Sequence, residues 1–118
     1  MTIKECYEIM GENYNDVLAR LQIERLVIKY VFKFLDDPTY EMLILALKEK
    51  DYATAYRASH TLKGICANLG FSKLGNVSAN LSDALKEKRI KQVEVEFLSL
   101  KDVYENTVSL LKKYQNSL

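Results

Sequence analysis

The sequence is poor in residues that break helices. Its 118 residues include one proline and four glycines, while 48% are hydrophobic and 28% are charged. A fold with many turns uses more glycine and proline, and a disordered chain carries fewer apolar residues. The length suits a single module that buries a core of its own. We therefore expect one all-α domain over residues 1–118.

An excess of charge, a cysteine framework and a long apolar run are also missing. The chain has seventeen Lys and Arg residues and sixteen Asp and Glu residues, so it has no excess of positive charge that would hold nucleic acid. Cys6 and Cys66 are too few and too far apart for a disulfide framework or a zinc site. The amino terminus mixes charged with apolar residues, unlike a signal peptide, and no stretch reaches the roughly 18 consecutive apolar residues of a membrane span. We expect a cytoplasmic protein that binds no metal, no nucleic acid and no membrane.

Apolar residues recur at three- and four-residue steps along most of the chain, which predicts amphipathic helices. Thr2 and Glu5 have the spacing of a capping box, so a short helix should begin there. A polar turn at 13–16 and a further helical turn follow, and the next helix should end before Pro38. We interpret residues 1–35 as helices that cover the rest of the fold. The positions expected to be buried between residues 24 and 47 are Val27, Tyr30, Val31, Phe34, Tyr40, Leu43, Ile44 and Leu47.

Four helical segments are expected within residues 39–116. Asp51 is a suitable N-cap for the second of them, over about residues 51–69, and Gly70 is a suitable left-handed C-cap. Ser72 can cap the following helix. Helices of this length joined by short turns pack most simply as an antiparallel bundle. The expected fold is an antiparallel up-down four-helix bundle with additional short N-terminal helices.

The one histidine lies in the middle of the helix expected at residues 51–69. At about 100° per residue, His60 points roughly 120° away from the centre of that helix's apolar stripe, so its imidazole should face water. A glycine inside a helix costs about 1 kcal/mol relative to alanine, and close approach of another molecule would explain Gly64. The residues that share or flank the outward strip are Ala53, Arg57, Lys63, Gly64 and Ala67.

These residue types suit transfer of a phosphoryl group. An imidazole is mostly neutral near pH 7 and keeps a lone pair, so it can attack phosphorus without a separate strong base. Lys63 at i+3 and Arg57 at i−3 could then offset the added negative charge from either side. Taken alone, each would be a solvated surface group. Their placement around one histidine makes them candidates for a phosphoryl site.

The segment His60-Thr61-Leu62-Lys63-Gly64, followed by Asn68-Leu69-Gly70, resembles the phosphorylation motif of histidine phosphotransfer (HPt) domains. The likeness extends over most of the chain, through the helix lengths and the entry at Asp51-Tyr52-Ala53. It implies that His60 is phosphorylated on Nε2, that Lys63 lies beside the phosphoryl group and that Gly64 leaves room for a receiver domain to dock. One departure is Ser82, where many members carry Glu after the preceding leucine.

The resemblance also implies a role and a set of partners. It identifies a phosphorelay intermediate of a two-component system, a phosphocarrier without ATP-dependent kinase activity of its own. The partners would be response-regulator receiver domains and a hybrid sensor kinase. The chain itself would hold no cofactor, because the receiver supplies the acceptor aspartate and the Mg²⁺. We expect a monomer whose partners bind transiently around the His60 strip, with Gly64, Ala53 and Ala67 in the docking surface.

Three other classes of protein compete with this interpretation. In an ATP-using histidine kinase fragment, the histidine is followed by an acidic residue and later by a proline, whereas Thr61 follows here and no proline does. A carboxylate-bridged metal bundle needs Glu-x-x-His pairs, and Arg57 stands three residues before the only histidine. A scaffold or inhibitor that docks receivers or kinases without carrying phosphate stays open.

Overall fold

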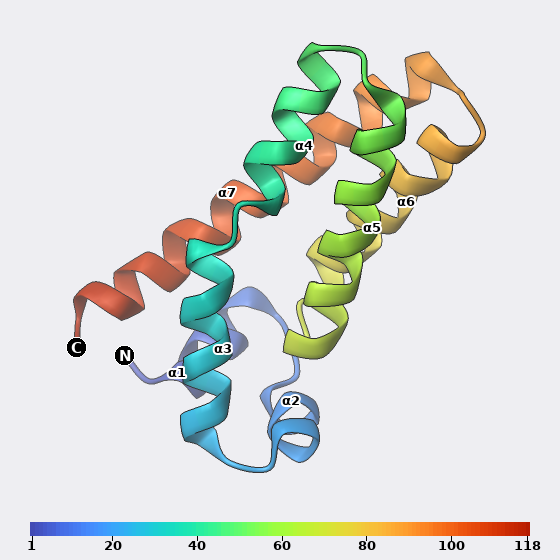
Figure 1. The fold of residues 1–118 in the computed structure, drawn as a ribbon. Coiled ribbons are helices and arrows are strands. Elements are labelled where there is room, and N and C mark those ends of the chain that lie inside the picture. The colour runs from blue at the N-terminus through green and yellow to red at the C-terminus, as the bar shows by residue number, and fades with distance from the viewer.

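The computed structural model describes residues 1–118 as seven α-helices without a strand (Figure 1). Three helices come first, at Ile3–Met10 (α1), Tyr14–Leu21 (α2) and Glu24–Asp36 (α3). The other four are α4 (Thr39–Lys48), α5 (Tyr52–Leu69), α6 (Ser72–Lys86) and α7 (Ile90–Asn116). Helices α4 to α7 alternate in direction, which confirms the predicted antiparallel up-down bundle with additional N-terminal helices. None of the seven combines the length and the apolar character that crossing a membrane requires.

The bundle is held together by contacts between neighbouring helices. Helix α5 packs between α4 and α6, and α6 packs against α7. The rings of Tyr40 and Tyr104 stack with centroids 3.7 Å apart and join α4 to α7. Helix α3 leads upward into α4 across the Asp37-Pro38 corner and contacts both α7 and α5 (Figure 1). The 27 residues of α7 span the molecule, since its rise of about 40 Å equals the longest dimension.

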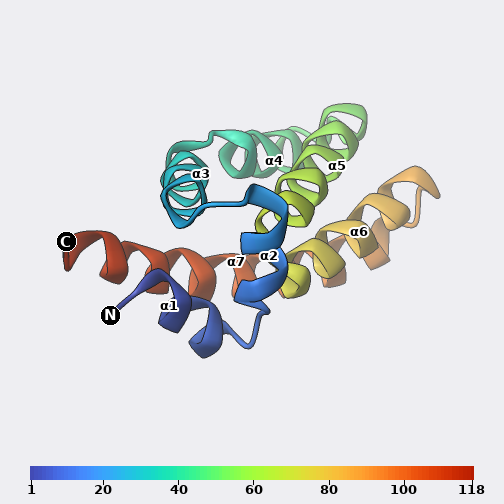
Figure 2. The same cartoon turned by 90° about the horizontal axis from the view of Figure 1, so that it is seen from below.

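Helix α1 and the turn that follows it are hydrogen-bonded to the end of α5 and the start of α6. The buried Tyr7 hydroxyl donates a hydrogen bond of 2.6 Å to the Leu69 carbonyl. The Glu12 carboxylate accepts from the Ser72 hydroxyl and, at 3.1 Å, from the Lys73 backbone N–H. Lys73 Nζ in turn donates to the carbonyl of Met10, near the end of α1, at 2.9 Å. Helix α1 also contacts α7, and α2 contacts α5 and lies near the turn between α5 and α6 (Figure 2).

The helix ends agree with the sequence at three caps. Thr2 and Glu5 form the predicted capping box, Asp51 caps α5 and Gly70 ends it in the left-handed conformation, with φ of 72°. The cap of α6 was predicted wrongly: Phe71 occupies that position, and the Ser72 hydroxyl donates to Glu12 instead.

Two further expectations need correction. Helix α2 begins at Tyr14, inside the segment predicted as a turn, with Asn13 as its N-cap. Tyr30 was expected in the core, but 39% of its surface is exposed. The buried side of α3 is formed by Val27, Val31 and Phe34. The Tyr30 ring lies at the edge of this side, where the ammonium groups of the neighbouring lysines stand 5.4 and 6.0 Å from its centroid.

Candidate functional site

Helix α5 carries the candidate site, and its first turn is fixed by Asp51. One carboxylate oxygen accepts from the Thr54 backbone N–H at 3.1 Å, and the other accepts from the Thr54 hydroxyl at 2.7 Å. Hydrogen bonds from the Thr54 side chain, and then from its backbone, hold the pKa of Asp51 below its usual value. The cap fixes where α5 begins.

The His60 side chain is exposed, as its direction on the helix predicts. The adjacent residues Ala58, Ser59 and Leu62 are buried, because they face α4 and α6. The Tyr56 ring lies beside the imidazole, with centroids 6.1 Å apart and planes inclined by 21°. Tyr56 is not among the residues that the sequence predicts for the site. Its i−4 position relative to His60, which places both on one face of a helix, is the signal that could have identified it as a neighbour.

The two candidate cations differ in where they point. Lys63 is exposed one turn after His60 and borders a hollow between α5 and α6. Arg57 is exposed one turn before His60, but its Nη2 donates to the Thr54 hydroxyl at 3.1 Å. That bond directs the guanidinium toward the start of α5 and away from the imidazole. Its role beside a phosphoryl group stays a prediction. That role requires the Arg57 guanidinium to release the Thr54 hydroxyl and to bind the phosphoryl group instead.

The outward strip around His60 is open. Gly64, Ala53 and Ala67 are all exposed, as predicted. A Cβ atom added to Gly64 would meet nothing within 4 Å, so no packing inside this chain requires a glycine there. A close crossing of two helices within this chain therefore does not explain Gly64. The glycine instead keeps the surface next to His60 flat.

A buried pair of hydroxyl groups joins α5 to α6 behind this strip. The Ser59 hydroxyl donates to the Tyr56 carbonyl at 3.0 Å and lies 2.8 Å from the Ser82 hydroxyl. Because the single Ser59 proton is used by Tyr56, Ser82 is the donor within the pair. Both hydroxyls are satisfied and neither carries charge. Ser82, the position at which this chain departs from the motif, is therefore a packing contact that faces away from the open strip.

The two cysteine thiols lie in the core and not at the surface. Cys6 and Cys66 are buried and unpaired, and burial raises the pKa of Cys66 to about 12. Its thiolate is therefore scarce at neutral pH. No group of three or more His, Cys, Asp and Glu side chains is placed to hold a metal ion.

Comparison with known families identifies one match. The model of the Hpt domain family matches residues 35–110, which include α4, α5, α6 and most of α7. His60 and every predicted site residue lie inside this range, whereas α1, α2 and almost all of α3 lie outside it. No curated protein and no solved structure matches the chain.

Proposed function

Because the chain belongs to the Hpt domain family, whose members act in histidine phosphotransfer, we propose that His60 accepts a phosphoryl group and exchanges it with the aspartate of receiver domains. The observation that carries this proposal is an exposed imidazole beside a glycine with open space above it, inside the matched range. A second protein can reach this ring without moving any part of the bundle.

The transfer step needs only the imidazole on this side of the interface. The Nε2 lone pair attacks the phosphorus of the partner's aspartyl phosphate, the N–P bond forms, and the P–O bond breaks as the aspartate leaves with its electron pair. The reverse step returns the phosphoryl group to a carboxylate. No proton has to move, because Nδ1 keeps its hydrogen throughout. The chain acts in this proposal as a phosphocarrier and not as a kinase.

Charge on the carrier has to be balanced on both sides of the interface. Lys63 stands one turn from His60 and would lie beside the phosphoryl group, with Arg57 as a second cation once it leaves Thr54. The partner receiver would supply Mg²⁺ through its own carboxylates. Such a partner presents an acidic site, which a cationic edge attracts. A hybrid sensor kinase that carries a receiver domain would bind the same strip.

The competing function is a scaffold or inhibitor that docks receivers without carrying phosphate. Incubation with a ³²P-labelled receiver domain separates the two functions. The wild-type chain should acquire acid-labile, base-stable label, whereas His60→Gln should acquire none and keep its helical circular dichroism. Label on both proteins, or on neither, would contradict phosphotransfer through His60.

A further inference from the structure

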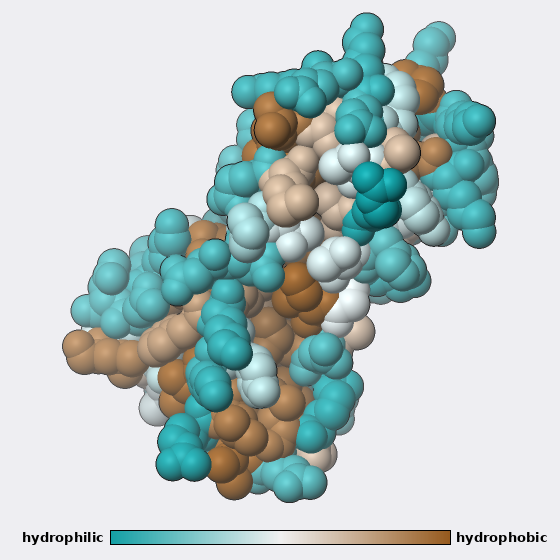
Figure 3. All heavy atoms as spheres, in the orientation of Figure 1, coloured by the Kyte–Doolittle hydropathy of each residue, from teal (hydrophilic) through white to brown (hydrophobic).

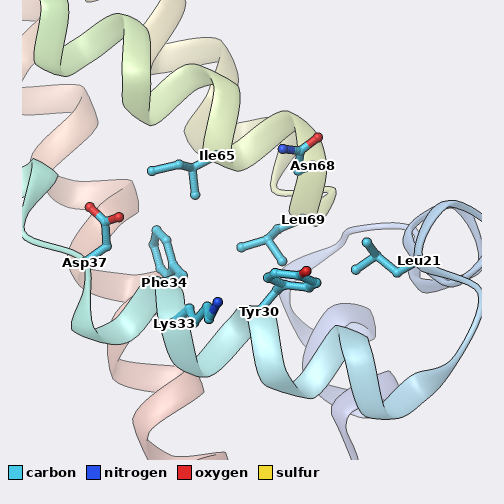
Figure 4. Close-up of a pocket in the computed structure, with 8 residues that line it drawn as sticks. All are labelled: Leu21, Tyr30, Lys33, Phe34, Asp37, Ile65, Asn68 and Leu69. Atoms are coloured by element: carbon cyan, nitrogen blue, oxygen red, sulfur yellow. The ribbon is translucent and has the colours of Figure 1, made fainter.

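Two hollows border the outward strip of α5, one on each side of its C-terminal half. The first, here called the apolar groove, lies between α3 and α5 and has a volume of about 420 Å³. Tyr30 and Phe34 of α3 face Ile65 and Leu69 of α5 across it, and Leu21 of α2 closes one end (Figure 4). Hydrophobic atoms are exposed in this hollow and along α3, between hydrophilic borders (Figure 3).

The second, here called the cationic hollow, lies on the α6 side of α5 and has a volume of about 370 Å³. Two cations line it, Lys63 of α5 and Arg20 of α2, and one acid, Asp16. The Arg20 guanidinium reaches over the end of α5, where its Nη2 is 3.8 Å from the position that a Cβ atom would take at Gly70. The floor is made of small residues, Ala67, Gly75 and Ala79, which leave the hollow open.

Both hollows lie within reach of a protein docked on His60. Seen down the helix, Lys63 lies about 60° to one side of His60 and Asn68, on the rim of the apolar groove, about 80° to the other. Along the axis, Asn68 is about 12 Å and Gly70 about 15 Å from His60. A standard interface covers about 800 Å² per partner, or a disc of about 16 Å radius. A receiver centred on His60 therefore meets the edges of both.

The walls that α2 and α3 contribute are held in place before any partner arrives. Tyr14, the first residue of α2, meets Tyr7 edge to face with ring centroids 5.6 Å apart, and Tyr7 is hydrogen-bonded to the last residue of α5. Phe34 is buried, and its ring meets Phe71 edge to face with centroids 5.2 Å apart. A surface fixed in this way loses little conformational entropy on binding.

We propose that the receiver domain docks across α5 onto α2 and α3, so that residues outside the family-matched range help to select the partner. The apolar groove takes an exposed apolar side chain of the receiver, with Tyr30 as its half-exposed aromatic wall. The cationic hollow faces the acidic rim of the receiver's Mg²⁺ site, and Arg20 extends the positive edge that Lys63 begins. This inference rests on the proposed function, because it takes a receiver domain as the partner.

The test uses the full chain with Arg20→Glu or Tyr30→Ala. The control for the charge reversal is Lys113→Glu, which also replaces an exposed basic residue in the last turn of a helix but lies near the end of α7. The control for the apolar deletion is Leu98→Ala, at an exposed position on α7. Each protein is labelled on His60 with phosphoramidate and mixed with a panel of receiver domains from the source organism, and the second-order rate constants for transfer are measured at two salt concentrations.

Labelling by the small donor should be the same in all five proteins, because no docking is involved. Transfer by Arg20→Glu should fall about threefold to tenfold at low salt and depend less on salt than in the wild type. The rate constant for transfer from Tyr30→Ala should fall by a similar factor at both salt concentrations, and the order of preference among receivers should change. The two controls should transfer as the wild type does.

Wild-type rates for both α2 and α3 variants with every receiver would overturn the inference while leaving His60 as the phosphoryl carrier. Failure of the wild type itself to take label or to transfer it would instead contradict the proposed function. Should Arg20→Glu lose helical structure, Arg20→Gln removes the charge without reversing it, and the salt dependence of its transfer decides the question.

Discussion

Replacement of Gly64 should raise stability and lower activity together. Gly64→Ala adds a methyl group at a helical position where nothing in the chain lies within 4 Å, so no contact is strained. Alanine is favoured over glycine inside a helix by about 0.8 to 1 kcal/mol, in part because glycine leaves more conformations open to the unfolded chain. For a chain of this length, that gain corresponds to a rise in Tm of about 3 to 6 °C.

The same methyl group occupies the surface that a receiver approaches. Gly64→Ala should therefore slow transfer from a phosphorylated receiver, and Gly64→Leu, which adds a larger side chain beside His60, should reduce it by at least about tenfold. Labelling of His60 by phosphoramidate should change much less, because that donor is small. The pattern expected of a docking glycine is thus a more stable protein that reacts with the small donor and transfers poorly to the large one.

Thermal unfolding followed by circular dichroism gives Tm, and single-turnover transfer gives the rate. Ser109→Ala is the matched control, because it improves helix propensity at an exposed position of α7 without touching the strip. It should raise Tm by about 1 to 3 °C and leave transfer unchanged. Rapid transfer by Gly64→Leu would refute the explanation of this glycine, and a lower Tm for Gly64→Ala would refute the account of its open surroundings.

The remaining predictions concern charge, acid and thiol chemistry. Lys63→Ala should slow transfer or shorten the lifetime of the phosphohistidine, measured as loss of label with time, without a change in Tm beyond that of Lys113→Ala. The pKa of Asp51 is lowered in the folded chain, so its cap stabilises fully above the ordinary value of 3.8 and is lost as pH falls through the lowered value. The difference in Tm between wild type and Asp51→Asn should therefore shrink on acidification, and a constant difference would contradict this assignment. Cys66, whose pKa burial raises to about 12, should react with a thiol reagent at pH 8 only after unfolding.

The bundle and the direction of His60 could be predicted from periodicity because local forces dominate there. The helices of the bundle carry apolar stripes at regular spacing, and Asp51 and Gly70 are caps that act within one turn of the residues they cap. The exposure of the imidazole follows once the stripe of α5 is known. These features depend on near neighbours in the sequence, which a single chain displays directly.

The rest depends on residues far apart in the sequence. Ser72 has the right residue type for an N-cap, but Glu12, sixty residues earlier, accepts its proton and also binds the backbone of α6. Tyr30 fits the apolar spacing of α3, yet the neighbouring helices cover only one side of that stripe. Arg57 has the correct spacing from His60, but its guanidinium is hydrogen-bonded to the Thr54 hydroxyl, on the side away from His60. Neither hollow beside α5 could be predicted, because each is formed by helices whose relative placement no local pattern encodes.

The most direct measurement is the departure of label from His60 to a receiver. The ³²P-labelled chain, freed of its donor, is mixed with an unlabelled receiver domain and Mg²⁺, and both proteins are followed with time. Label should start on the chain as base-stable phosphohistidine and then appear on the receiver as base-labile aspartyl phosphate, at a rate proportional to receiver concentration. Label that stays on the chain, or that is released only as inorganic phosphate without passing through any receiver, would contradict the role of His60 as a phosphoryl carrier between proteins.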